Sequence, residues 1–255
     1  MAEQFPHYIE FRHVYKSFDH PVLIDSNFHV DPGETVAIIG RSGVGKSVTL
    51  GNIMGFIKPD SGRVIVAHED VTDCSETEWR RVRRKVTMVF QSGALFDSLT
   101  VAENVGFGIL NLRPDLAGHW RDVVNEKLGL VGLDPQIGDL KPAELSGGMK
   151  KRVGLARAIA YEPDYILYDE PTTGLDPIMS DVINQLIRSL QKRIGLTSVV
   201  VTHDLHSAWT VGDRLALLHE GRVQFTGTPD EAKASSDLLV RQFIEGRSEG
   251  PVPAV

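Results

Sequence analysis

Cysteine is almost absent from this sequence, since Cys74 is the only one among 255 residues. A single cysteine forms no intrachain disulfide and cannot build a metal site alone, which favours a reducing compartment such as the cytoplasm. Long apolar runs are also missing: stretches such as Val36–Ile39 end after a few residues, whereas a helix that spans a bilayer needs about 20. The first residues have neither a basic start nor an apolar stretch, so we expect no secretory signal.

An excess of basic residues is lacking as well. The 34 acidic residues outnumber the 27 basic ones and give a net charge of −7. A protein that coats nucleic acid needs a basic face, so we expect no nucleic-acid partner. The hydrophobic fraction of 42% and the charged fraction of 24% are typical of a globular protein with a sizeable core. The length fits one large domain or two small ones.

Short apolar runs alternate with helical patterns towards both ends of the chain. Strands are expected at residues 9–13, 22–30, 35–39, 63–67, 86–90, 165–169, 198–202, 215–219 and 222–225. Helices are expected at 45–54, 76–84 and 178–194, the last with Asp176 as its N-cap and Pro177 as its first residue. The predicted apolar face of that helix consists of Ile178, Val182, Ile183, Leu186, Ile187 and Leu190. This alternation predicts an α/β fold with a largely parallel sheet covered on both faces.

Residues 92–160 have a different pattern. Thr100 and Glu103 have the spacing of a capping box, and helical patterns follow without a convincing strand. We therefore expect an α/β core at about 1–91 and 161–245, a helical subdomain at about 92–160, and a tail at 246–255. Because the tail is rich in glycine and proline, the chain from Val240 to Val255 is expected to run extended. The basic run at 80–85 is expected to be a solvated helix face, with contact to anionic lipid headgroups as the alternative.

The pattern G-x-x-x-x-G-K-[ST] occurs at Gly40–Ser47, between an apolar strand and a helix. Glycines allow backbone N–H groups to surround an anion, and the start of the helix adds a partial positive charge. Lys46 is expected to reach the β- and γ-phosphates of ATP, and the Ser47 hydroxyl to coordinate Mg²⁺. The residues expected to bind ATP here are Gly40, Ser42, Gly43, Gly45, Lys46 and Ser47. The alternative is a glycine-rich turn with a chance lysine.

Two acidic residues, Asp169 and Glu170, end the apolar strand 165–169. At the carboxyl end of a strand both can border a phosphate site. Asp169 is expected to hold Mg²⁺ and Glu170 to polarise the attacking water, whereas the alternative is an ordinary surface pair.

A second candidate anion site precedes a basic helix, where Ser146 is the expected N-cap and is followed by Gly147 and Gly148. Taken alone, this segment fits an ordinary capped helix equally well.

Together these segments resemble the ATP-binding-cassette (ABC) ATPases over nearly the whole chain. Leu145-Ser146-Gly147-Gly148-Met149 is similar to the family signature Leu-Ser-Gly-Gly-Gln, with methionine in place of glutamine. The resemblance implies a P-loop NTPase fold with an antiparallel β layer and a helical subdomain. It also implies a head-to-tail dimer that holds two Mg-ATP, in which each signature faces the partner's nucleotide.

The same resemblance assigns roles to further residues. Phe18 corresponds to the aromatic residue that stacks on adenine, with Tyr15 as the alternative, and Gln91 to the glutamine that contacts Mg²⁺. Asp176 corresponds to the aspartate that crosses the dimer interface, and His203 to the histidine that senses the γ-phosphate. Without the resemblance, Phe18 would be expected in the core and His203 as a hydrogen-bonded histidine at a strand end. The expected catalytic residues are Glu170, His203, Lys46 and Gln91.

A narrower similarity is to the ATPases of Mla-type lipid transporters. The segments that carry it are Gln91–Phe96, the signature ending in Met149, Asp176–Ile178, Val240–Gly246 and Gly250–Pro253. This similarity implies that the chain drives phospholipid transport by hydrolysing ATP. It also implies that the chain lies at the cytoplasmic face of the inner membrane. The implied partners are an integral membrane permease, which docks around Gln91–Asn104 and the helical subdomain, and an Mce-domain protein. A small cytoplasmic regulator is a further partner that the similarity allows.

Three alternative functions remain open from the sequence. The first is an ABC ATPase without a transport role, for example in iron–sulfur assembly, and the second is the ATPase of another small-solute importer. The third is a P-loop kinase, which would need an acceptor site and gives no reason for the signature or for His203.

Overall fold

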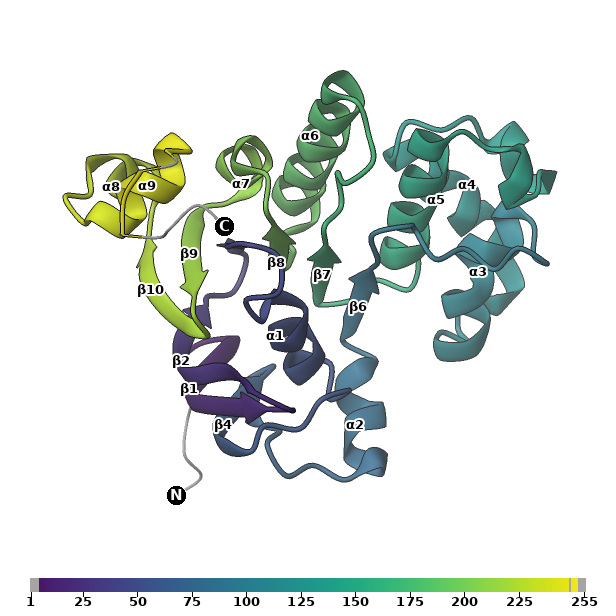
Figure 1. Cartoon of the computed structure of the whole chain (residues 1–255). Coiled ribbons are helices and arrows are strands. Elements are labelled where there is room, and N and C mark those ends of the chain that lie inside the picture. Colours follow the sequence, from purple (N-terminus) through teal and green to yellow (C-terminus); the bar gives the residue numbers. More distant parts are fainter. Residues whose placement is uncertain (1–4, 248, 252–255) are drawn as a thin grey trace. The chain divides into compact units, whose positions relative to one another are not determined.

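The computed structural model describes residues 5–247 and 249–251 (Figure 1). The chain divides into two compact units. The first unit contains the chain up to Trp79 and from Thr197 onwards, and the second contains Arg80–Leu196. No helix among the described residues combines the length and the apolar composition that crossing a membrane requires.

An antiparallel sheet forms one part of the first unit. Its strands are β2 (Pro21–Val30), β1 (Ile9–Ser17), β4 (Ser61–Val66) and β5 (Glu69–Asp70), in that order. Ile9 pairs with Val30 on one side and with Val66 on the other, and all three are buried. The antiparallel layer implied by the sequence is confirmed.

A second group of strands in this unit follows the order β10 (Arg222–Gly227), β9 (Arg214–His219), β3 (Thr35–Ile39) and β8 (Thr197–Thr202). Strand β3 runs parallel to β8 and β9, while β10 pairs antiparallel with β9. Every residue of β3 and β8 is buried, as expected for parallel strands covered on both faces. The helices of this unit are α1 (Lys46–Ile53), α7 (Leu205–Val211), α8 (Pro229–Ala234) and α9 (Leu238–Glu245).

Helix α9 contradicts the expectation that the chain from Val240 onwards is extended. Asp237 caps this helix by accepting hydrogen bonds from the backbone N–H groups of Leu239 and Val240, and Gly246 ends it in the left-handed conformation with φ 63°. Val240 is buried in a core cluster with Leu217, which supplies the energy that holds the helix in place. Residues 248 and 252–255 of the predicted tail lie outside the described residues.

The second unit contains the parallel strands β6 (Val86–Val89) and β7 (Tyr165–Asp169). Residues 92–160, all of which are described, contain helices and turns but no strand, as predicted. The helices of this segment are α3 (Val101–Leu112), α4 (Trp120–Leu130) and α5 (Gly147–Ile159), with short 3-10 helices at Ala117–His119, Pro135–Asp139 and Pro142–Glu144. The predicted capping box is present at the start of α3, where Thr100 and Glu103 exchange hydrogen bonds. Helix α2 (Glu76–Arg83) contains the boundary between the units.

Helix α6 (Pro177–Ile194) begins as predicted, because the Asp176 carboxylate accepts a hydrogen bond of 3.0 Å from the backbone N–H of Met179. Its apolar face is narrower than predicted. Ile183, Ile187 and Leu190 are buried, but Ile178 is 78% exposed and Val182 is 41% exposed. Ile178 and Val182 lie four positions apart, so they form a separate stripe on the helix surface beside the stripe of buried residues. The apolar residues predicted to form one face of this helix therefore form two stripes, of which one is buried and the other is exposed.

Candidate active site

The loop between β3 and α1 has the backbone geometry of an anion cradle. Gly43 and Gly45 have φ of 82° and 109°, a region that side chains other than glycine rarely adopt. At Gly40 a Cβ atom would lie 2.4 Å from the carbonyl oxygen of Leu218, so only glycine fits. Gly45 is the N-cap of α1, and no side chain of the described residues caps this helix. The start of a helix presents backbone N–H groups that have no partner within the helix itself, an arrangement that favours anion binding.

Lys46 places its cation over this loop. Its Nζ atom donates hydrogen bonds to the carbonyl oxygens of Gly40 at 2.8 Å and Arg41 at 3.0 Å, and the residue is only 7% exposed. Ser42 and Ser47 are exposed on the same segment. A buried amine at the start of a helix and an accessible hydroxyl together fit a polyphosphate, and the roles of these residues in ATP binding stay a prediction.

Phe18 lies in the turn between β1 and β2 and is 58% exposed, with the Lys16 Nζ atom 5.3 Å from the centre of its ring. This exposure excludes the alternative that Phe18 is a core residue. Tyr15 is also partly exposed, at 39%. Residues 20–22, which begin two positions after Phe18, line the same cavity of about 560 Å³ as residues 41–44 of the phosphate loop. Adenine stacking by Phe18 stays a prediction.

His203 leaves the sheet beside the phosphate loop. Strand β8 pairs with β3 in a register that places Thr202 opposite Ile39, so His203 and Gly40 both follow paired residues of neighbouring parallel strands. His203 is exposed. Asp204 follows it and caps α7 by accepting hydrogen bonds from the N–H groups of His206 and Ser207. The first unit therefore brings His203 to the same edge of the sheet as the phosphate loop.

The second unit brings Gln91 and the acidic pair together in the same way. Val89 pairs with Tyr168, so Gln91, Asp169 and Glu170 lie at the carboxyl ends of neighbouring parallel strands. Glu170 has φ of 51°, an uncommon conformation for a residue other than glycine, and its carboxylate accepts a hydrogen bond of 3.1 Å from the Thr173 hydroxyl. Such strained residues concentrate at functional sites.

The signature segment forms the start of α5. The Ser146 hydroxyl caps this helix by accepting a hydrogen bond of 3.3 Å from the N–H of Met149, as predicted. Gly147 has open space where a side chain would be, whereas Gly148 lies against the end of the Met179 side chain, in the first turn of α6. Since Asp176 is the N-cap of α6, the signature and the start of α6 are neighbours within this unit.

Two residues of α5 that the sequence did not single out position the neighbouring loops. Lys151 Nζ donates hydrogen bonds of 2.7 Å to the carbonyl oxygens of both Pro171 and Thr173, just after Glu170. Burial lowers the pKa of Lys151, and the nearby charge of Glu170 opposes that shift. Arg157 donates to the carbonyl oxygens of Gly93 and Ala94, which follow Gln91. Burial lowers the pKa of Arg157 as well. In the sequence these two residues are simply cations of a basic helix, so only their long-range contacts reveal the role.

Replacing Lys151 by methionine is expected to lower ATP turnover about tenfold and to leave ATP affinity within about twofold of the original. The variant loses two hydrogen bonds from a charged donor, each worth about 1.5–3 kcal/mol, that hold the segment after Glu170. Steady-state phosphate release and a direct ATP titration separate the two effects. Lys150→Met, which changes the adjacent and partly exposed lysine of α5, is the matched control. Equal turnover in both variants would show that Lys151 does not position this loop.

Comparison with known proteins identifies the family to which these features belong. Residues 23–173 match the ABC transporter family. The chain belongs to the ABC transporter family. Among solved ABC structures, a dimeric bacterial ABC transporter cassette superposes with a TM-score of 0.79 at 34% identity, over 86% of this chain and 98% of that one. CbiO1 of Clostridium perfringens, part of an ABC transporter complex, gives 0.82 at 31% identity, over 91% and 92%. The predicted ABC fold is confirmed.

Relatives within the ABC family include two transport systems with different names. The intermembrane phospholipid transport system ATP-binding protein MlaF of Haemophilus influenzae is 40% identical over 93% of this chain and 90% of its own length. MlaF of Escherichia coli K12 is 40% identical over 88% and 83%. The probable ribonucleotide transport ATP-binding protein mkl of Mycobacterium bovis is 38% identical over 89% of this chain, which spans 63% of that protein. The predicted similarity to Mla-type ATPases is confirmed.

Proposed function

We propose that this chain is the ATP-hydrolysing subunit of a transporter that moves phospholipid in the cell envelope. The observation that carries the proposal is the 40% identity to MlaF over about nine tenths of both chains. The mkl protein extends well beyond the matched part, so its ribonucleotide name says less about this chain. Neither a P-loop kinase nor an ABC ATPase without a transport role is favoured, because the match over residues 23–173 is to the ABC transporter family.

In this proposal ATP is bound by the loop at Gly40–Ser47, with Lys46 on the β- and γ-phosphates and Phe18 on adenine. Glu170 accepts the proton of the water that attacks the γ-phosphate, and His203 donates a hydrogen bond to that phosphate. The side chains of Ser47, Gln91 and Asp169 offer only oxygen ligands for Mg²⁺, the type this ion prefers. Mg²⁺ when bound neutralises charge on the phosphate oxygens.

The proposed assembly is a head-to-tail dimer on a membrane permease. Ser146, Gly147, Gly148 and Asp176 of each subunit complete the partner's nucleotide site, and solved relatives of this fold are dimeric, one of them bound to ADP and phosphate after hydrolysis. The permease docks around Gln91–Asn104, which includes the exposed Phe96. An Mce-domain protein and, in some assemblies, a small regulator complete the complex. The chain then lies at the cytoplasmic face of the inner membrane.

Reconstitution of the chain with a membrane permease and an Mce-domain protein tests the proposed function. Proteoliposomes that contain this complex are expected to transfer a fluorescent phospholipid to acceptor vesicles only when ATP is hydrolysed. The same complex with Glu170→Gln provides the control for ATP dependence. ATP-dependent uptake of ribonucleotides without phospholipid transfer would contradict the proposed substrate.

A further inference from the structure

The end of β1, which leads into the turn with Phe18, is irregularly paired. Its last two residues, Lys16 and Ser17, pair with β2, and the register between the two strands shifts on both sides of Lys16. Ser17 lies opposite Pro21, which has no backbone N–H to donate. The pairing of β1 with β4 ends one residue before Lys16. A regular ladder therefore does not fix the backbone just before Phe18, so contacts from outside the β1–β2 pair matter here.

Asp60, the residue before β4, supplies such contacts. Its carboxylate accepts a hydrogen bond of 2.7 Å from the Lys16 Nζ atom and another of 2.7 Å from the backbone N–H of Ser17. Its own N–H donates a bond of 2.8 Å to the carbonyl oxygen of Tyr15. The hydrogen bond from Lys16 and then that from Ser17 hold the pKa of the Asp60 carboxyl below its usual range. Asp60 thus binds the three consecutive residues that precede Phe18.

Lys16 connects Asp60 with the aromatic ring itself. The Lys16 amine lies over the Phe18 ring, 5.3 Å from its centre, and the lysine side chain is only 16% exposed. A lysine without the carboxylate would sample many rotamers, so the bond to Asp60 keeps the cation in place over the ring. Phe18 is nevertheless exposed, so a planar base has access to it.

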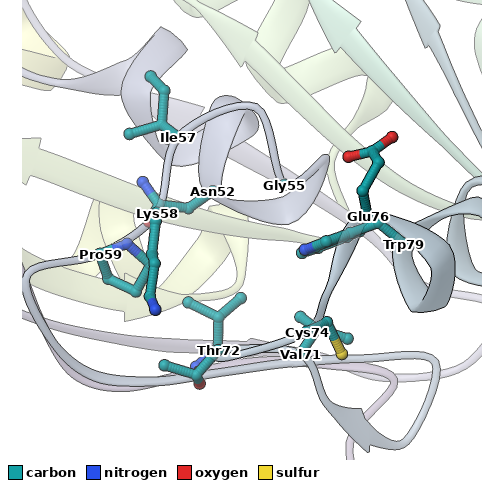
Figure 2. Close-up of a pocket in the computed structure, with 11 residues that line it drawn as sticks. Asn52, Gly55, Ile57, Lys58, Pro59, Val71, Thr72, Cys74, Glu76 and Trp79 are labelled. Carbon is teal, nitrogen blue, oxygen red and sulfur yellow. The ribbon is translucent and has the colours of Figure 1, made fainter.

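The loop between α1 and β4, which carries Asp60, is packed on both sides. The carbonyl oxygen of Gly51 in α1 accepts hydrogen bonds of 2.9 and 3.1 Å from the N–H groups of residues 56 and 57. At Gly55, where φ is 67°, a Cβ atom would lie 2.2 Å from the indole ring of Trp79, so the ring packs directly on the loop backbone. Figure 2 shows Gly55 and Trp79 at the wall of a pocket that this loop borders. Asp60 therefore projects from a well-packed support.

We propose that Asp60 is a positioning residue for adenine binding, which holds the end of β1 and the Lys16 amine so that the Phe18 ring is already oriented when ATP arrives. This inference rests on the role of Phe18 in the proposed function. A turn that is ordered before binding loses less conformational entropy when the base stacks, and so the affinity for ATP is higher. The effect is confined to the base, because Asp60 contacts the turn with Phe18 and not the phosphate loop.

Calorimetric titrations of the full chain with ATP and with inorganic tripolyphosphate test this proposal, since tripolyphosphate has the phosphates of ATP but no base. Asp60→Ala removes both side-chain hydrogen bonds and is expected to raise the Kd for ATP about three- to tenfold, the value of one net hydrogen bond. Its Kd for tripolyphosphate is expected to stay within about twofold of the original. Asp60→Asn, which keeps the size of the side chain and loses its charge, should show a smaller loss in the same direction.

Asp73→Ala is the matched control. Asp73 also forms an ion pair of 2.8 Å with a lysine, Lys58, but its side chain is 84% exposed. This variant is expected to bind ATP and tripolyphosphate normally. Equal losses of ATP and tripolyphosphate affinity in a folded Asp60→Ala variant would contradict a role confined to the base.

A double variant shows whether Asp60 acts through Phe18. Phe18→Ala removes the stacking surface and is expected to raise the Kd for ATP about 10- to 100-fold, the usual range for a base stacked on an aromatic side chain. Adding Asp60→Ala to this variant should change the Kd by less than about twofold, because no ring is left to position. A further loss of about threefold or more would mean that Asp60 acts independently of Phe18, and the inference would be wrong.

The single variants separate a failure of this inference from a failure of the proposed function. If Phe18→Ala weakens ATP binding and Asp60→Ala does not, the inference is overturned while the adenine site stands. If Phe18→Ala binds ATP as tightly as the unmodified chain, the proposed role of Phe18 is wrong, and the inference about Asp60 is rejected with it.

Discussion

Replacing Lys46 by alanine is expected to abolish measurable ATP binding. Lys46 is the cation of the phosphate loop, and its amine is already held over the carbonyl oxygens of Gly40 and Arg41. Loss of a contact between a charged donor and a phosphate in this buried site costs about 1.5–3 kcal/mol or more, which corresponds to at least a tenfold to hundredfold rise in Kd. A direct titration with ATP, without turnover, measures the effect.

A matched variant separates this effect from a general loss of positive charge. Lys233→Ala removes a lysine whose side chain is 61% exposed on α8, and it is expected to bind ATP normally. Thermal unfolding of both variants shows whether the loop without its lysine still folds. Undiminished ATP binding by a folded Lys46→Ala variant would overturn the assignment of the phosphate loop.

Replacing Glu170 by glutamine is expected to reduce turnover by about 10²–10⁴-fold, the usual contribution of a general base, and to preserve ATP binding. Glutamine keeps the size of the side chain and tolerates the left-handed backbone at φ 51° about as well as glutamate. With hydrolysis blocked, two ATP molecules should hold two subunits together. Size-exclusion chromatography of this variant should then show a dimer only in the presence of ATP.

The control for this variant is a glutamate in a similar backbone conformation. Glu162 has φ of 58°, its side chain is 56% exposed, and it pairs with Arg113 rather than lying at the end of β7. Glu162→Gln is therefore expected to hydrolyse ATP at the normal rate and to remain monomeric with ATP. Near-normal turnover of Glu170→Gln would show that another group is the base.

Local signals in the sequence predicted much of the fold. Thr100 with Glu103, and Asp176 with Pro177, mark helix starts that the structure confirms, because a cap is recognised from three or four consecutive residues. Helix α9 was missed although Asp237 and Gly246 bracket it with an N-cap and a left-handed end. The glycines and prolines that follow this segment led to the prediction of an extended chain. The core cluster that buries Val240 is formed by residues distant in the sequence, so no local pattern indicated that the helix would be stable.

The places of the motif residues in the fold were predictable from the sequence. The residues that hold the neighbouring loops in position were not. The loop at Gly40–Ser47 lies before a helix and the acids lie at the end of β7, as their sequence patterns predicted, and their roles in ATP binding and hydrolysis stay predictions. Lys151 and Arg157 act through hydrogen bonds to backbone carbonyls 20 or more residues away, and no local pattern encodes such contacts.

Helix α5 has a consequence for how the second unit opens. One of its lysines is bonded to the segment after β7, and one of its arginines to the segment after β6. Detaching either loop breaks hydrogen bonds from a charged donor of this helix, each worth about 1.5–3 kcal/mol, so the helix contributes to the free energy of opening of both loops. We therefore expect the two loops and the helix to open as one cooperative unit, so that a perturbation at either loop changes the opening equilibrium of the other.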